Sequence, residues 1–254
     1  MNIRAERPGI KQTPRRDRAM TRTKRKEMTM QDKGQISVSM MCVRLDLTMD
    51  YLKAFERNDV ELLHIDVMDG TFVPNITIGV DYVKQLREIS KQPFDFHFMV
   101  EDPEEKMPWF DIREGDLVSV HWESTRHINK CMQYIKSRGA KASVALNPGT
   151  PLFVLEEVYD YLDAVLLLSV NPGFAGQKII PSVFKKVERM RKQLDEMGRQ
   201  DVTIIADGNM SNENAKLMYD AGARIFVAGT SSIVKTTVDG VDDRIAAMRR
   251  SIGY

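Results

Sequence analysis

The run LLHIDVMDG (62–70) places His64 and Asp66 two residues apart within an apolar segment. Successive side chains of a β-strand alternate between its two faces, so these two side chains point to the same side. The run breaks at Asp69-Gly70, which puts both near the carboxyl end of the expected strand. Two side chains of types that bind metal ions therefore share one pocket.

Two later strand-like segments carry the same residue types. His97 lies in FDFHFMV (94–100), and Asp207 lies in VTIIADGN (202–209). Each alone is most simply a buried polar residue hydrogen-bonded to the backbone. All of them together, without a cation, would leave large desolvation costs uncompensated. Two imidazoles and two carboxylates suit one divalent metal ion, and Zn, Fe(II), Mn and Co all accept such a ligand set.

The elements that must position these residues follow a regular order. From residue 34 onward, short apolar segments alternate with longer amphipathic ones, the pattern of parallel βα units. The pattern predicts an α/β fold with a single domain over 34–254, a (β/α)8 TIM barrel. The alternative, a doubly wound open sheet, is disfavoured because no GxGxxG motif follows the first strand. The expected strands cover 36–42, 61–67, 94–100, 117–122, 141–146, 164–170, 202–207 and 224–229.

Two of the intervening segments have clear helical periodicity. Residues 182–198 and 212–223 carry apolar residues at helical spacing, and glycine marks the end of each. Ser182 is the expected N-cap of the first helix.

Active sites of such barrels lie at the carboxyl ends of the strands, where all the candidate ligands fall. Glycine-rich turns follow the last three expected strands, at 171–177, 207–209 and 228–232. Backbone amides in such turns bind phosphate, and a phosphate site after the last two strands recurs in this architecture. Each turn alone is an ordinary connection, but three neighbouring ones favour a phosphorylated substrate.

A phosphorylated substrate beside a metal ion indicates proton abstraction next to a carbonyl, through an enediolate whose charge the metal stabilises. Asp66 and Asp207 come from the second and seventh expected strands, so they can face opposite sides of a flat intermediate. One would remove a proton and the other would return one, which inverts a stereocentre. Met68 and Met99 fall at the mouth, either as an apolar roof over the intermediate or as simple packing residues.

Composition limits the other possibilities. The chain has 254 residues, of which 43% are hydrophobic, enough to bury a large core. No apolar run approaches the ~20 residues of a membrane-spanning helix, so no membrane association is expected. Cys42 and Cys131 are the only cysteines, which disfavours a disulfide scaffold and favours a reducing, cytoplasmic setting.

The net charge of +1 conceals an asymmetry. Residues 1–33 contain 11 Lys or Arg and 4 Asp or Glu, a net charge of +7, whereas the remainder has 26 and 32, a net charge of −6. The segment 1–33 is expected to be a disordered basic extension. It is a nucleic-acid arm, a targeting peptide, or the product of a start codon upstream of Met28 or Met30. The third interpretation weighs as much as the other two together, and nucleic-acid binding is not favoured.

Motifs over about residues 36–250 resemble those of the ribulose-phosphate 3-epimerase family. They are HIDVMDGTFVPNITIG (64–79), HFMV (97–100), ALNPGTPL (145–152), SVNPGFAGQKIIP (169–181), ADGN (206–209) and AGTSS (228–232). The resemblance implies a catalytic barrel of the ribulose-phosphate-binding type, with His64, Asp66, His97 and Asp207 as the metal ligands. It also implies that Asp66 accepts a proton and Asp207 donates one in one direction of the reaction. The residues expected to contact the substrate are Ser39, Met68, His97, Met99, Gly173, Phe174, Ala175, Gly176, Asp207, Gly208, Asn209, Gly229 and Thr230.

The chain departs from the family pattern at several positions. Thr71 stands where histidine or arginine is usual, Val38 replaces a proline, and Leu168 stands where a third methionine of the roof is common. Ala175 and Asn209 replace glycines of the phosphate-binding loops. None of these departures touches an expected metal ligand or acid-base residue.

The departures leave the substrate open between two ketose phosphates. FAGQ and GTSS look more like the allulose-6-phosphate 3-epimerase branch, whereas NPGTPL and SVNPGF look more like the pentulose enzyme. We expect interconversion of ribulose 5-phosphate and xylulose 5-phosphate, a step of the pentose phosphate pathway, by a homo-oligomer. A noncatalytic sugar-phosphate-binding barrel is the alternative of another class. A decarboxylase or aldolase would want a catalytic lysine at a strand end, and none of the expected strands carries one at the mouth.

Overall fold

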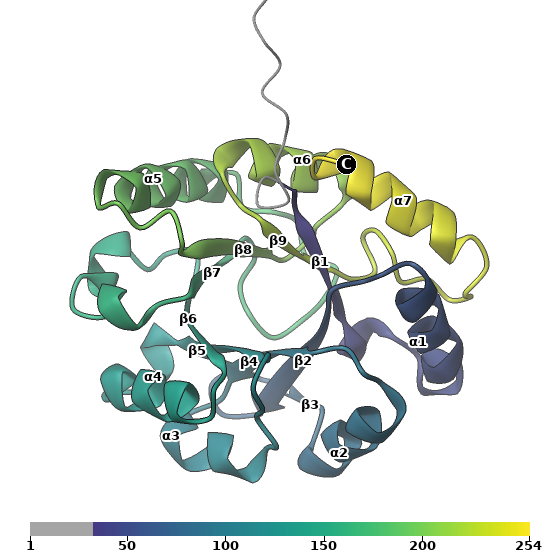
Figure 1. The fold of residues 1–254 in the computed structure, drawn as a ribbon, viewed down its shortest axis with the longest axis horizontal. Coiled ribbons are helices and arrows are strands. Elements are labelled where there is room, and N and C mark those ends of the chain that lie inside the picture. The colour runs from purple at the N-terminus through teal and green to yellow at the C-terminus, as the bar shows by residue number, and fades with distance from the viewer. Residues whose placement is uncertain (1–32) are drawn as a thin grey trace, which may run out of the picture.

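Eight parallel strands close into a ring in the computed structural model, which describes residues 33–254 (Figure 1). β1 pairs with both β9 and β2, and this pairing closes the sheet into a barrel. The expected (β/α)8 barrel is confirmed, whereas residues 1–32 of the expected basic extension lie outside the described part of the chain. The strands are β1 (Gln35–Ser39), β2 (Leu62–Asp69), β4 (Phe94–Met99), β5 (Leu117–His121), β6 (Lys141–Leu146), β7 (Ala164–Leu168), β8 (Thr203–Asp207) and β9 (Ile225–Ala228).

A short ninth strand, β3 (Ile76–Thr77), pairs antiparallel with the end of β2. Its register joins Thr77 to Met68 and Ile76 to Asp69, so the chain folds back over the mouth of the barrel directly after the candidate ligands. The sequence analysis did not predict this hairpin, because a two-residue strand has no measurable periodicity.

Helices cover the outside of the ring (Figure 1). The α-helices are α1 (Thr48–Arg57), α2 (Val80–Ile89), α3 (Pro103–Lys106), α4 (Ile128–Ser137), α5 (Ser182–Glu196), α6 (Asn212–Ala221) and α7 (Val241–Ser251). The connection between β6 and β7, which is described throughout, contains only the 3-10 turns Leu152–Leu155 and Tyr159–Tyr161. The further 3-10 turns are Met40–Cys42, Leu45–Leu47, Met107–Trp109 and Trp122–Ser124.

The caps of the two predicted helices differ. Ser182 is the first residue of α5 and not its cap: the cap position is Pro181, and within residues 33–254 no side chain caps this helix. In α6, by contrast, Ser211 Oγ accepts a hydrogen bond from the Asn214 N–H at 3.2 Å. Gly222 ends α6 with φ of +114°, a conformation that a side chain would strain.

Alternation along the strands decides what faces the barrel interior. His64 and Asp66 share the inner face of β2 with Leu62, which belongs to a buried apolar cluster formed by inward side chains of six strands. The outward residues of the same strands pack against the helices in a larger core that includes Phe96, Val165 and Ile204. The inner apolar cluster forms a floor, and the polar residues therefore collect above it at the carboxyl ends.

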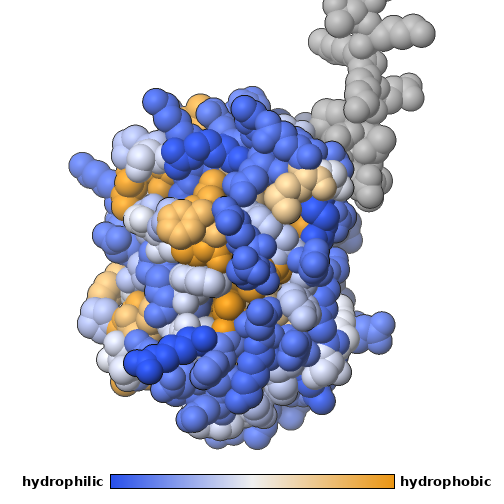
Figure 2. Space-filling model, turned by 90° about the vertical axis from the view of Figure 1, so that its left-hand side faces the viewer, coloured by the Kyte–Doolittle hydropathy of each residue, from blue (hydrophilic) through white to orange (hydrophobic). Residues whose placement is uncertain are grey.

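α5 shows how the helices join the barrel. It buries Val183, Val187 and Met190 against the sheet and exposes Lys185 and Glu188. This side of the molecule, with α5 and the β6–β7 connection, shows a mostly hydrophilic surface with small apolar areas between the charged groups (Figure 2). Among the described residues, no helix is long and apolar enough to span a membrane.

Candidate metal centre and active site

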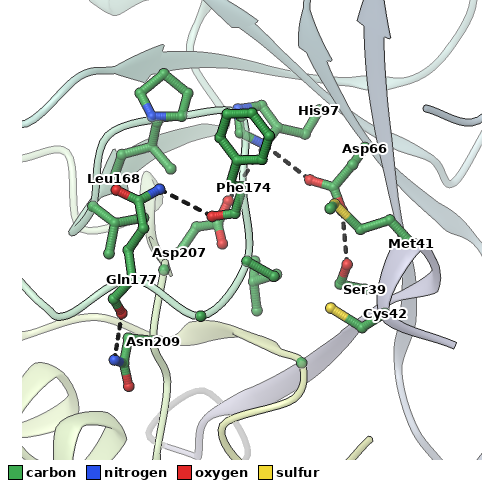
Figure 3. A pocket seen from close by; sticks show the side chains of 18 of the residues that line it. Ser39, Met41, Cys42, Asp66, His97, Leu168, Phe174, Gln177, Asp207 and Asn209 are labelled. Carbon is green, nitrogen blue, oxygen red and sulfur yellow. Dashed lines mark hydrogen bonds and ion pairs between the residues drawn. The ribbon is translucent and has the colours of Figure 1, made fainter. Parts of the chain in front are cut away.

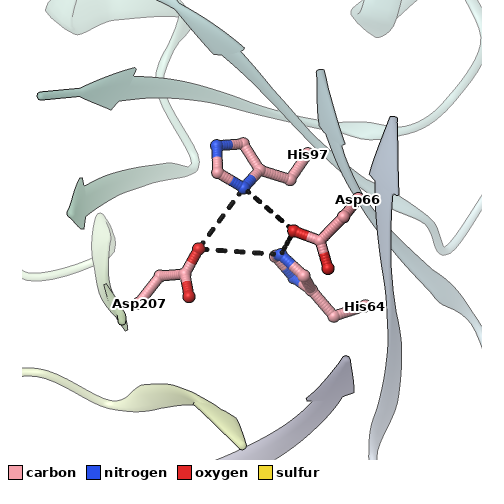
Figure 4. Close-up of side chains that lie close together, drawn as sticks. All are labelled: His64, Asp66, His97 and Asp207. Atoms are coloured by element: carbon pink, nitrogen blue, oxygen red, sulfur yellow. Dashed lines mark ion pairs between the residues drawn. The ribbon is translucent and has the colours of Figure 1, made fainter. Parts of the chain in front are cut away.

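His64 and Asp66 from β2, His97 from β4 and Asp207 from β8 converge inside the carboxyl end of the barrel (Figure 4). Each offers one ligand atom, and the four atoms lie within 4.8 Å of one another. His64 Nε2 lies 3.3 Å from Asp66 Oδ1 and 3.8 Å from Asp207 Oδ2. His97 Nδ1 lies 3.7 Å and 3.3 Å from the same two oxygens. The residues that the sequence analysis singled out therefore form one cluster.

The two nitrogens of this cluster are polar atoms without hydrogen bonds. His64 Nε2 and His97 Nδ1 are buried and have no hydrogen-bond partner among the described residues. Both lie against the same carboxylate oxygens of Asp66 and Asp207. Two imidazole nitrogens and two carboxylate oxygens around one point match the ligand set of a divalent transition metal. These side chains fit such an ion.

The charges of the cluster are consistent with a site for a cation. Burial lowers the pKa of His64, but Asp66 and Asp95 outweigh it and raise that pKa well above the ordinary value. Burial raises the pKa of Asp66, but His64 and His97 outweigh it and lower that pKa below the ordinary value. The buried carboxylates therefore need positive charge beside them, from protonated imidazole or from a metal ion.

A second layer of hydrogen bonds orients these groups. His64 Nδ1 lies 2.7 Å from Asp95 Oδ2, which also accepts a hydrogen bond from Ser37 Oγ at 2.8 Å. The bond to Asp95 leaves His64 Nε2 to face the cluster, an arrangement common behind metal-binding histidines. Ser39 Oγ donates to Asp66 Oδ2 at 2.7 Å and so fixes the second oxygen of that carboxylate.

A cavity of about 350 Å³ lies above the cluster (Figure 3). Every residue that the sequence analysis expected to contact the substrate lines this cavity, whereas His64 lies beneath it. Several lining residues were not anticipated as contacts, among them Met41, Cys42 and Gln177. Met41 lies two residues beyond the end of β1, Met68 lies one residue before the end of β2, and Met99 ends β4. A methionine close to the end of a strand is the signal that could have found Met41. The full lining also contains Leu168, Val170, Asn171, Pro172, Val227 and Ser231.

Methionines form one wall of the cavity. Met68 and Met99 are almost completely buried, and they pack with Val73 in a small cluster that Met41 and Phe72 extend. Both methionines line the cavity and also pack against each other, so the two interpretations of these residues are compatible. The wall presents polarisable, apolar groups beside the charged cluster.

Glycine is required where the loops after β7 and β8, which line the cavity, contact each other. Gly208 has φ of +100°, and a Cβ there would lie 2.7 Å from Val170 Cγ2 and 2.9 Å from Ser169 Oγ. The loop after β8 therefore lies against the loop after β7. Gly173, at φ of +115°, belongs to the second of these loops.

Asn209 was expected to replace a glycine, and the conformation of its backbone is one that asparagine accepts. Its φ is +50°, in the left-handed region that asparagine adopts more readily than most residues. Its Nδ2 donates to Gln177 O at 2.6 Å, and Gln177 Nε2 in turn donates to Asn171 O at 2.6 Å and to Phe174 O at 3.0 Å. The side chain therefore ties together two of the three loops expected to bind phosphate.

Asp66 and Asp207 lie on opposite sides of the two imidazoles (Figure 4). Both carboxylates line the cavity, and their side chains are 8% and 14% exposed. Carboxylates so placed can reach a flat substrate from two faces. The arrangement can therefore remove a proton from one side of a carbon atom and deliver one to the other.

Comparison with known proteins gives consistent matches. The sequence profile of the ribulose-phosphate 3 epimerase family matches residues 35–233. The ribulose-phosphate 3-epimerase of Bacillus subtilis (strain 168) is 46% identical over 180 residues, which are 71% of this chain and 83% of that protein. The chloroplastic ribulose-5-phosphate-3-epimerase of Arabidopsis thaliana is 44% identical over 198 residues, 77% of this chain and 70% of that protein.

A solved structure supports the fold alone. The crystal structure of 3-hexulose-6-phosphate synthase from Salmonella typhimurium has a TM-score of 0.58. Its sequence is 17% identical, and the match covers 85% of this chain and 98% of that chain. At this sequence identity the structural similarity supports the barrel fold but says nothing of the activity.

Proposed function

The chain belongs to the ribulose-phosphate 3-epimerase family, and on that premise we propose that it interconverts ribulose 5-phosphate and xylulose 5-phosphate. The reaction inverts C3 of a pentulose phosphate, so the enzyme is an isomerase of the epimerase type. The observation that carries the proposal is the pair of cavity-lining carboxylates, Asp66 and Asp207, on opposite sides of the His64 and His97 imidazoles. The curated relatives named above are pentulose-phosphate enzymes, and they do not favour the allulose 6-phosphate alternative.

Proton transfer falls to the two aspartates. Asp66 removes the C3 proton from one face of the substrate, and Asp207 delivers a proton to the opposite face of the planar enediolate. The roles exchange in the reverse direction. Ser39 Oγ, 2.7 Å from Asp66 Oδ2, holds that carboxylate in position while its proton occupancy changes.

The cluster prepares the site for the negative charge of this intermediate. The ligands would be His64 Nε2, Asp66 Oδ1, His97 Nδ1 and Asp207 Oδ2. A divalent cation held there supplies positive charge beside the oxygens on which charge develops as the proton leaves. The methionine wall excludes water from the same place, which strengthens these interactions.

The phosphate belongs at the end of the cavity built by the glycine-rich loops. Gly173, Gly208 and Gly229 line this end, with Asn209 and Thr230 beside them. Binding the phosphate there would align C3 with the two aspartates, because the loops follow β7, β8 and β9 on the same rim. Turnover would then depend on the phosphate as well as on the reacting carbon.

The test is a direct comparison of two substrates. One metal-loaded sample is given ribulose 5-phosphate and, separately, allulose 6-phosphate, and formation of each C3 epimer is followed. We expect kcat/KM to be far higher for ribulose 5-phosphate. A higher kcat/KM with allulose 6-phosphate would show that the hexulose phosphate is the preferred substrate. No turnover of either sugar would refute the proposed epimerase activity.

Four expectations about the cellular role and assembly of the protein remain predictions. They are a cytoplasmic location, a role in the pentose phosphate pathway, a homo-oligomeric state and the identity of the metal. The Arabidopsis relative is described as chloroplastic, so location differs among proteins of this kind. Light scattering during size-exclusion chromatography would give the oligomeric state.

A further inference from the structure

A chain of polar groups runs from His97 away from the cavity, through the buried His121 to the half-buried Glu123. His97 Nε2 lies 2.9 Å from His121 Nε2, and His121 Nδ1 lies 3.1 Å from Glu123 Oε2. The other carboxylate oxygen, Oε1, accepts hydrogen bonds from the Asn147 N–H at 2.9 Å and from Thr150 Oγ1. His121 is fully buried and does not line the cavity, so it makes no contact with a substrate there.

A metal ion bound to His97 Nδ1 would determine which atom donates in each hydrogen bond of this chain. A neutral imidazole carries one N–H, so a His97 that gives its Nδ1 lone pair to a metal keeps its hydrogen on Nε2. His121 Nε2 must then accept, which places the single hydrogen of His121 on Nδ1, facing Glu123. Phe72 packs on the His121 ring with the two centroids 4.8 Å apart, which keeps water from replacing these partners.

We propose that His121 and Glu123 are positioning residues that hold His97 in the tautomer that presents Nδ1 to the metal. The inference rests on the proposed metal site. The opposite His121 tautomer would set its Nε2–H against the Nε2–H of His97, two donors facing each other in a buried place. Glu123 prevents this arrangement, because a carboxylate only accepts hydrogen bonds.

Glu123 is built to remain such an acceptor. Burial raises its pKa, but hydrogen bonds from His121 and Thr150 outweigh burial and lower that pKa to about 2. Lys186, a buried lysine of α5, donates to Asn147 O at 2.7 Å and fixes the turn that holds the carboxylate. The proposal therefore gives the NPGT segment (147–150), which does not line the cavity, a place in the metal centre.

The hydrogen bonds around His64 support the inference that a carboxylate positions His97. His64 reaches a buried carboxylate, Asp95, directly, and a hydroxyl donates to that carboxylate. His97 reaches Glu123 through one intervening imidazole, and a hydroxyl again donates to the carboxylate. Both candidate histidine ligands thus end at a carboxylate, the pattern that fixes the orientation and basicity of metal-binding imidazoles.

Nitrogen NMR tests the tautomers in the unaltered protein. The chain has four histidines, so two-bond ¹H–¹⁵N spectra of ¹⁵N-histidine-labelled protein loaded with diamagnetic Zn(II) can be assigned. The variant His127→Asn removes the exposed histidine and identifies its signals. We expect hydrogen on Nε2 of His97 and on Nδ1 of His121. Hydrogen on Nε2 of His121, or on both of its nitrogens, would overturn the proposal.

Metal affinity tests the role of Glu123. In Glu123→Gln, one of the positions that accept hydrogen bonds becomes an NH₂ group, so either His121 or the NPGT turn faces a donor. We expect the Zn(II) dissociation constant, measured by competition with a chromophoric chelator, to rise roughly 10–100-fold. The His121 Nδ1–H signal should also disappear or exchange between two tautomers. The control Glu105→Gln, an exposed glutamate of α3, should match the unaltered protein.

The outcomes distinguish the metal site from the relay, by which we mean the hydrogen-bonded chain from Glu123 through His121 to His97. If the unaltered protein binds no Zn(II), the metal site and the relay both fail. If it binds Zn(II), and Glu123→Gln binds within twofold of it with unchanged tautomers, only the relay is wrong. Should Glu123→Gln not fold, Thr150→Val removes one donor to the carboxylate and should still weaken Zn(II) binding several-fold. Unchanged binding in that variant would likewise refute the relay.

Discussion

Replacing each aspartate separately tests the two-face mechanism most directly. In Asp207→Asn, Asp66 keeps its hydrogen bond from Ser39 and can still remove the C3 proton that faces it. The amide at position 207 cannot deliver a proton to the other face. We therefore expect epimerisation to fall on the order of 10²–10⁴-fold, the usual loss for a positioned acid or base. This loss corresponds to about 3–5 kcal/mol of activation free energy.

Solvent exchange distinguishes the two halves of the reaction. From the epimer whose C3 proton faces Asp66, Asp207→Asn should still exchange that proton with D₂O, and exchange should fall less than epimerisation. From the other epimer, exchange should fall as far as epimerisation does. Asp66→Asn should show the opposite preference. Loss of the ¹H signal at C3 gives the exchange rate, and a coupled assay gives the epimerisation rate.

The comparison needs matched metal content, because both aspartates belong to the cluster. Elemental analysis of each sample provides the correction, and Asp81→Asn, an exposed change on α2, serves as the control. If both metal-loaded variants epimerise at near the unaltered rate, the two aspartates are not the acid and base. Equal losses of exchange from both epimers in both variants would also refute assignment of one face to each.

Three further changes have expected outcomes. Chelation should abolish turnover and a divalent metal should restore it, because the cluster holds two carboxylates and two imidazoles; full turnover in a sample shown to be metal-free would contradict this. Ribulose without phosphate should react roughly 10²–10⁴-fold less efficiently, since two charge-assisted hydrogen bonds of about 1.5–3 kcal/mol each would be lost; comparable kcat/KM values would argue against the phosphate site. Burial lowers the pKa of Lys186 to about 8. The unfolded chain binds this proton more tightly between pH 8 and 10.5, so the folded protein should gain about 3 kcal/mol over that range relative to Lys186→Met. Urea unfolding at several pH values checks this, and the control Lys185→Met, an exposed change, should keep the full pH dependence of stability. If the stability of Lys186→Met changes with pH as much as that of the unaltered protein, the prediction is wrong.

The barrel was predictable because its signals are local. Strands buried on both sides are short apolar runs, and AVLLL (164–168) shows this for β7. The two-residue spacing of His64 and Asp66 fixed their common face, and the breaks after the strands placed them at the mouth. Neither inference needed knowledge of a distant contact.

The contacts of His121 and Glu123 were missed because they join residues that are distant in the sequence. His121 stands within an expected strand, but its role depends on His97, 24 positions away, and Thr150 lies 27 positions from Glu123. The absence of an α-helix between β6 and β7, a connection described throughout, also escaped notice. Pro148 and Pro151 interrupt the start of that connection and favour tight turns there.

The closing pair of strands also constrains biosynthesis. Three candidate ligands lie on β2 and β4, whereas Asp207 ends β8, more than 100 residues later along the chain. A nascent chain that has emerged only as far as β7 would have an open sheet, with β1 and the apolar β7 as its unpaired edges. Such edges invite pairing with other chains and are a site at which a chaperone would act. The four candidate ligands are all present only once β8 has been synthesised, so metal binding by the complete set would be a late event of synthesis.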